Sequence, residues 1–308
     1  AEALLAETEV QLGASVRGLY WRLTLTRQLE QVTKEHVART QELLSAVMSR
    51  YEVGKAGQHS VLRMQVLSDQ LTDELLEFDK LDREFTAALT RALARHDGTF
   101  ETPTELEPVK PPEGSERWIE QALESRPALD IIRAEIEGSK TAANLSRLEG
   151  LPDPTVWLGY RVRFTDTTTD PGTDLLSAGV SVPIPVGSGR RARGTRLAHL
   201  EAARRAQARL EAAEDKLVTD LETVHAQWSR SFAKSSTYRR ELLPLALSML
   251  ETTLSDYAVD KANFSSLYEA QVAVLELERA MQSATAETHI RQAEATALMG
   301  GKLPGDSP

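Results

Sequence analysis

Residues 50–56 read RYEVGKA, and residues 256–262 repeat them as DYAVDKA. The match continues at the same offset of 206 residues, because residues 60–61 recur in similar form at 266–267. An offset this long does not fit a solenoid repeat and is typical of a duplicated half-molecule. In both copies, one apolar-periodic stretch precedes the segment and another follows it. The pattern predicts a helical hairpin, present twice, with its turn at the repeated segment.

Apolar residues at heptad spacing flank both turns and predict coiled-coil seams. Before the first turn they step by four, three and four at Leu12, Val16, Leu19 and Leu23, and before the second turn they take the same steps at Leu217, Leu221, Val224 and Trp228. A single proline, Pro244, predicts a kink in the second long helix. The expected fold class is mainly α, with long antiparallel coiled-coil hairpins in two structural repeats and one β-hairpin.

Breaks in the pattern predict six segments. They are a first helical hairpin at 1–100, a proline-rich linker at 101–115, a helical segment at 116–150 that breaks near Pro127, the β-hairpin at 151–188, a second helical hairpin at 189–300 and a disordered tail at 301–308.

Two stretches of alternating apolar and polar residues predict the β-hairpin. Its apolar positions are Val156, Leu158, Tyr160, Val162 and Phe164 in the first strand, and Leu176, Ala178, Val180, Val182 and Ile184 in the second. A hairpin of a transmembrane barrel has this pattern. A soluble hairpin half-buried against helices has it too, and spacing alone favours that second interpretation.

Composition excludes several classes of function. The formal net charge of −10 argues against a nucleic-acid binder. The one basic cluster, Arg190, Arg191, Arg193 and Arg196, has no interleaved aromatic residues and fits a solvated helix start or a membrane-facing rim. Histidines are scattered, and no metal-ligand spacing, nucleophile elbow or phosphate loop occurs, so we expect no enzyme, cofactor or metal site. Cysteine is absent, and neither a signal peptide nor an apolar run of membrane-spanning length is present.

Taken in order, these motifs resemble the TolC-like outer-membrane efflux factors, nearest to the heavy-metal efflux branch that partners resistance-nodulation-division pumps. The residues that carry the resemblance are Leu151-Pro152-Asp153-Pro154 with the strand to Tyr160, the stretch from Val180 to Pro185, the Arg126-Pro127 breaker and the two Tyr-x-Val-x-Lys-Ala turns. The resemblance implies an outer-membrane exit duct that passively conducts substrates from an inner-membrane pump and a periplasmic adaptor. It also implies a homotrimer with a shared barrel in the outer-membrane lipid and a periplasmic helical tunnel, whereas the net charge is the reason that we expect no nucleic acid as a partner.

The chain departs from the family pattern at its start. Counted by the repeat offset, Ala1 falls opposite Gln207, so the first copy lacks a counterpart of residues 116–206. We therefore expect an N-terminally truncated form, without the first β-hairpin and without the signal peptide.

In the resembled family, the helical turns dock onto the adaptor. The matching residues are Tyr51, Val53, Gly54, Lys55, Ala56, Ser60 and Val61 in the first turn, and Tyr257, Val259, Asp260, Lys261, Ala262, Ser266 and Leu267 in the second. The competing interpretation is that the tyrosines and valines only staple the turns and that Ser60 and Ser266 only cap the following helices. Gly54 permits a positive φ, whereas Asp260 stands in its place in the second turn and predicts a different shape or affinity there.

Two other classes of protein remain as alternatives. A periplasmic adaptor carries a long helical hairpin, but only once, between the halves of a lipoyl-like β-domain. A cytosolic coiled-coil scaffold would have no evident use for the amphipathic hairpin at 152–185.

Overall fold

The structure is a computed structural model that describes residues 1–148, 151–162, 174–183 and 188–301. Two of the predicted strand residues, Phe164 and Ile184, lie outside the described residues, as do residues 302–308 of the predicted tail. The chain forms two compact units, one made of Ala1–Pro127 with Asp215–Pro308 and the other of Ala128–Glu214.

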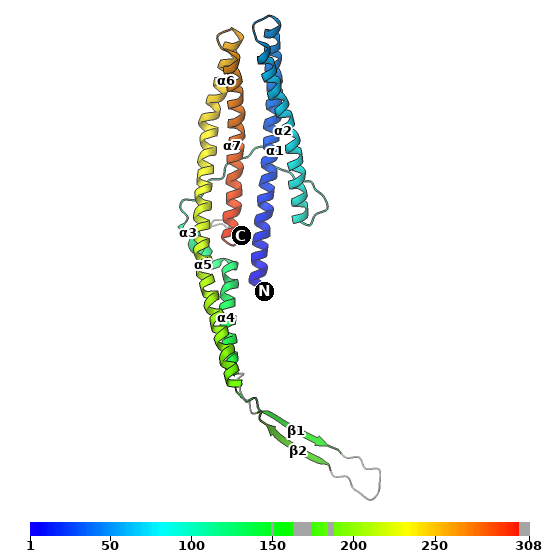
Figure 1. The fold of residues 1–308 in the computed structure, drawn as a ribbon, viewed down its shortest axis with the longest axis vertical. Coiled ribbons are helices and arrows are strands. Elements are labelled where there is room, and N and C mark those ends of the chain that lie inside the picture. Colours follow the sequence, from blue (N-terminus) through cyan, green and yellow to red (C-terminus); the bar gives the residue numbers. More distant parts are fainter. Residues whose placement is uncertain (149–150, 163–173, 184–187, 302–308) are drawn as a thin grey trace. The chain divides into compact units, whose positions relative to one another are not determined.

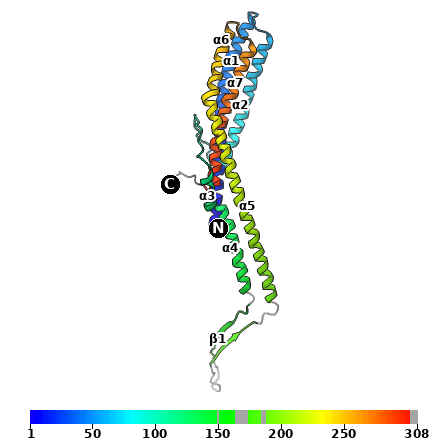
Figure 2. The same cartoon turned by 90° about the vertical axis from the view of Figure 1, so that its left-hand side faces the viewer.

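The first unit is built on two helical hairpins, as the repeat predicts (Figure 1). In the first hairpin α1 (Glu2–Glu52) packs on α2 (Gln58–Ala92), and in the second α6 (Leu243–Ala258) packs on α7 (Phe264–Leu298). Helix α1 also packs on α7, which joins the hairpins, and Figures 1 and 2 show the turns of both hairpins at the same end of this unit.

A shared apolar core holds the four helices together beneath the turns. Each helix contributes residues to it: Val32, Leu43 and Val47 from α1; Met64, Leu67 and Leu71 from α2; Ala246, Leu250 and Tyr257 from α6; and Phe264, Leu267, Ala270, Val274 and Leu275 from α7. Burial of the valine, leucine, methionine and phenylalanine side chains in this set contributes roughly 1.5–3 kcal/mol each. The two hairpins therefore form one packed body rather than two independent arms.

Polar side chains fill the contact between α1 and α7 farther from the turns. His36 is fully buried, with Nε2 at 2.7 Å from Glu278 Oε2 and Nδ1 at 3.1 Å from Gln271 Nε2. Arg279 donates to Thr33 Oγ1 at 2.9 Å. Because buried polar groups are costly unless they are paired, this layer fixes the register of one hairpin against the other.

The second long helix is interrupted where the proline predicts it. Helix α5 (Ser188–Thr237) runs into a π-helical turn, η1 (Tyr238–Leu242), before α6 starts with Pro244 in its first turn. Proline has no N–H to donate to the preceding turn, so the backbone widens there instead of continuing as an α-helix.

The proline-rich linker and the short helix α3 (Glu116–Ser125) belong to the first unit and pack on its long helices. The Trp228 indole donates to the Val109 carbonyl at 2.7 Å, and the Val109 N–H donates to Thr288 Oγ1 at 3.0 Å. Gln28 donates to the Pro103 carbonyl at 2.8 Å. The linker is tied to α1, α5 and α7 along its length.

The second unit contains most of α4 (Pro127–Leu148), the first part of α5 and the β-hairpin. Strand β1 (Thr155–Arg161) pairs antiparallel with β2 (Leu175–Ser181), and Leu158 lies opposite Ala178. This register places the predicted apolar residues of both strands on one face, and Val156, Leu158, Tyr160, Leu176 and Val180 are exposed. The interpretation of a hairpin half-buried against helices is therefore wrong.

The four arginines of the basic cluster are exposed on the first turns of α5, which fits both predicted positions, a solvated helix start and a membrane-facing rim. Across the described helices, none has a stretch that is long and apolar enough to span a membrane.

Candidate functional site

The two repeated turns have the same backbone. Gly54 and Asp260 both lie in the left-handed region, with φ of 74° and 62°. In the first turn the Lys55 N–H donates to the Arg50 carbonyl, and in the second the Lys261 N–H donates to the Asp256 carbonyl, both at 2.8 Å. The expectation that Asp260 changes the shape of its turn is therefore wrong. Aspartate is one of the few residues apart from glycine that enters this region readily.

The helices that leave the turns are capped differently. Asn263 precedes α7, and its Oδ1 accepts from the Ser266 N–H at 2.9 Å. Helix α2 starts after Gly57 without a side-chain cap, and Ser60 is buried inside its first turn. The interpretation of Ser60 and Ser266 as caps is wrong, because Asn263 caps the second copy and no side chain caps the first.

Ion pairs join one turn to the other. Asp260 accepts from Lys55 Nζ at 2.8 Å through Oδ2 and pairs with the Arg50 guanidinium through Oδ1. The side chain that replaces the glycine of the first copy thus reaches across to two cations of the first hairpin. The replacement adds a contact between the hairpins while the backbone stays the same.

Arg50 is the centre of this contact. Its guanidinium also donates to the Ala258 carbonyl at 3.2 Å and lies 4.6 Å from the centre of the buried Tyr257 ring. A guanidinium over an aromatic face is attracted by the ring quadrupole. Arg50 therefore contacts the end of α6 and the turn after it through the Asp260 carboxylate, the Ala258 carbonyl and the Tyr257 ring.

The predicted docking residues divide by exposure. Ser60, Tyr257 and Leu267 are buried in the protomer and serve packing. Ala56, Val61 and Ala262 are half-buried, whereas Tyr51, Val53, Gly54, Lys55, Val259, Asp260, Lys261 and Ser266 are exposed. The exposed residues make one surface, here called the tip surface, on which both turns present a valine, Val53 and Val259.

Sequence reasoning missed Arg50 and Asn263. The repeat alignment carries a signal for Arg50, because it places this arginine opposite Asp256 while Gly54 stands opposite Asp260. Positions where two copies differ by charge are candidates for contacts between the copies. Across the described residues, no group of three or more histidine and acidic side chains is placed to hold a metal ion.

The family described as outer membrane efflux protein matches residues 118–301, which is more than half of the chain. No curated protein sequence matches this chain.

Solved structures of outer-membrane channels share the fold. The outer membrane protein VceC from Vibrio cholerae aligns with a TM-score of 0.83 and 16% identity, over 97% of this chain and 72% of its own. The MtrE outer membrane channel from Neisseria gonorrhoeae aligns with a TM-score of 0.79 and 14% identity, over 97% of this chain and 68% of its own. CusC aligns with a TM-score of 0.79 and 12% identity, over 98% of this chain and 71% of its own. At such identities the likeness establishes the fold.

Proposed function

We propose that this chain, which belongs to the outer membrane efflux protein family, is a subunit of the exit duct of a tripartite efflux or secretion system. In this role it conducts substrates passively across the periplasm and the outer membrane. An inner-membrane pump supplies the energy, and a periplasmic adaptor connects the pump to the duct. The working assembly is a homotrimer whose helical hairpins line the periplasmic tunnel.

The exposed β-hairpin supports a place in the outer membrane. Its apolar face combines Val156, Leu158 and Tyr160 with their partners on β2, and no residue in the described part of the chain covers this face. Exposed contiguous apolar surface needs a partner or a membrane to cover it. In the proposal, lipid covers this face after the hairpins of three protomers have joined in a barrel.

The main observation in favour of contact with an adaptor is the tip surface. Two turns, 206 residues apart in sequence, share one backbone, and Asp260 bonds them together across the hairpins. A rigid pair of small, partly apolar turns suits end-to-end contact with another helical hairpin. We therefore propose that the adaptor docks on this surface.

Cysteine cross-linking in cells tests the docking, and because residues 1–308 contain no cysteine, each variant introduces a single thiol into this part of the protein. Val53→Cys and Val259→Cys are expected to cross-link to the adaptor through a short bis-maleimide. Leu76→Cys is the matched control, because Leu76 is 70% exposed and Val53 is 69% exposed, yet Leu76 lies along α2 away from the turn. Equal cross-linking from all three positions, or none from the two turns, contradicts tip docking.

Cross-linking between identical chains tests the assembly. A trimer in the outer-membrane fraction supports the duct, whereas a soluble dimer supports the alternative of a coiled-coil scaffold. Cross-links to the pump, with no trimer in the outer-membrane fraction, would support the alternative of a periplasmic adaptor.

A further inference from the structure

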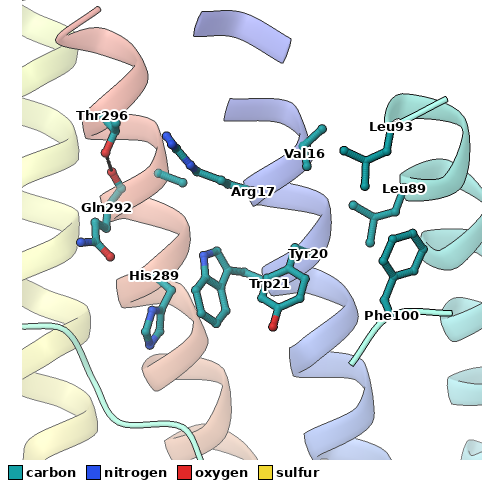
Figure 3. Close-up of a pocket in the computed structure, with 11 residues that line it drawn as sticks. Val16, Arg17, Tyr20, Trp21, Leu89, Leu93, Phe100, His289, Gln292 and Thr296 are labelled. Carbon is teal, nitrogen blue, oxygen red and sulfur yellow. Dashed lines mark hydrogen bonds between the residues drawn. The ribbon is translucent and has the colours of Figure 1, made fainter. Parts of the chain in front are cut away.

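A cavity of about 410 Å³ lies among α1, α2, α7 and the segment that follows α2 (Figure 3). All of its lining residues belong to the first unit, far along the chain from both turns. Its volume falls in the range of roughly 300–1,000 Å³ that is usual for small-molecule sites. Neither the packing of the hairpins nor the tip surface requires it.

Aromatic rings form one wall of the cavity. The Trp21 ring stacks on His289 with 4.0 Å between centroids and 30° between planes, and Tyr20 meets Trp21 edge-on at 5.0 Å. Phe100 lies on the opposite side of the opening, beside Leu89 and Leu93 (Figure 3). The space between these walls suits a flat apolar body, because offset and edge-on ring contacts are favourable.

His289 contributes a neutral ring to this wall. Its Nε2 lies 2.9 Å from the Glu107 carbonyl oxygen, which can only accept, so Nε2 carries the proton. Burial lowers the pKa of His289, and the bond to Glu107 only partly offsets this. The histidine therefore supplies stacking surface and leaves the positive charge of the cavity to another residue.

Arg17 supplies that charge. Its guanidinium points toward the part of α7 that carries Gln292 and Thr296 (Figure 3). Within the described ranges of the chain, neither the Arg17 nor the Gln292 side chain has a hydrogen-bond or ion-pair partner, and none of the 11 lining residues is acidic. In a chain with a net charge of −10, a cavity with a free arginine and no carboxylate selects an anion.

We propose that this cavity binds a small planar aromatic carboxylate. The ring packs against the aromatic side chains that line the cavity, Trp21, Tyr20 and Phe100, and the carboxylate accepts from the fork of the Arg17 guanidinium and from the Gln292 amide. A planar guanidinium fits a carboxylate with two parallel hydrogen bonds, which gives the site its preference for this group. This site is separate from the docking proposed for the tip surface, and either can hold without the other.

Calorimetric titration of the purified full chain in its native assembly, with 2-naphthoate as probe, tests the site. Arg17→Gln is expected to weaken binding of 2-naphthoate by roughly 10- to 100-fold, the loss typical of a hydrogen bond between charged groups. Neutral 2-naphthamide should bind more weakly than 2-naphthoate and lose less than about twofold in the same variant, since it makes no ionic contact. Trp21→Leu should weaken both probes by about tenfold.

Arg22→Gln is the matched control, because Arg22 is an exposed arginine on the same helix that does not line the cavity. Arg17 is itself exposed, so its replacement should preserve the helix content, which circular dichroism checks. Absence of 2-naphthoate binding to the unmodified protein overturns the proposal. Equal losses in Arg17→Gln and Arg22→Gln, or equal affinities for the acid and the amide, overturn it as well.

Discussion

Asp260→Asn is expected to loosen the contact between the two turns without altering the backbone of either. Asparagine has nearly the same size as aspartate and enters the left-handed region readily, so the φ of 62° at this position costs no more than before. The substitution removes only the charge that pairs with Arg50 and Lys55. Its effect therefore reports the two ion pairs and little else.

The size of the effect follows from exposure. The side chains of Lys55 and Asp260 are 56% and 48% exposed, and such a pair contributes roughly 0.2–1 kcal/mol. Arg50 is only 16% exposed and is held by a carbonyl and a ring as well, which places its pair near the upper end, at about 1 kcal/mol. Together the pairs stabilise the closed turns by about 1.2–2 kcal/mol, a factor of about 8–30 in the equilibrium for local opening.

Hydrogen–deuterium exchange measures this opening. Peptides from residues 50–61 and from 256–267 should exchange about 8–30 times faster in Asp260→Asn, while peptides around Leu221 keep their rate. Asp256→Asn is the matched control, because it removes the same charge four residues earlier, from a side chain that has no ion-pair partner in the described structure.

Unchanged exchange in Asp260→Asn, or equal acceleration by Asp256→Asn, would refute the proposed contact. A second check is the double variant with Arg50→Gln. If Arg50 and Asp260 act through one shared pair, the double variant should open little faster than the single variants.

Three further predictions concern single side chains. Gly54→Trp should lower export while Gly54→Asn preserves it, because tryptophan adds bulk to the tip surface and is strained at a φ of 74°, whereas asparagine enters this region readily; export from cells measures this. Asn263→Ala should destabilise the protein by about 1 kcal/mol in chemical denaturation through loss of the α7 cap, and Ser266→Ala should cost less. Because the pKa of His289 is lowered from 6.5 by burial, the unfolded chain binds more protons, so stability should fall as pH drops below 6.5. Melting curves of His289→Gln should lack this part of the pH dependence.

Periodicity predicted the fold where a helix buries one apolar face. The resemblance to outer-membrane efflux factors is confirmed by the family match, and both helical hairpins occur where the repeat places them. The seam before the second turn is also confirmed, because Leu221 and Trp228 are buried. These elements are predictable because a heptad pattern specifies a single buried stripe.

The same reasoning failed on α1, which packs against two helices. Leu12 is exposed although it belongs to the predicted seam, whereas Thr24, Thr33 and His36 are buried. Helix α1 needs a second contact face for α7, and this face is polar and paired by hydrogen bonds. A search for apolar spacing does not detect such a face.

The differences between the two copies carry information that their similarity does not. A cation at position 50 and an aspartate at position 260 belong to different copies, because Asp256 stands opposite Arg50 and Gly54 stands opposite Asp260. Two turns with the first sequence, RYEVGKA, would lack the aspartate at the glycine position. Two turns with the second sequence, DYAVDKA, would lack the arginine. The Arg50–Asp260 pair therefore requires one turn of each kind, so it favours contact between unlike hairpins over contact between like ones. After a duplication, such a charge difference is one way to fix which hairpin lies beside which.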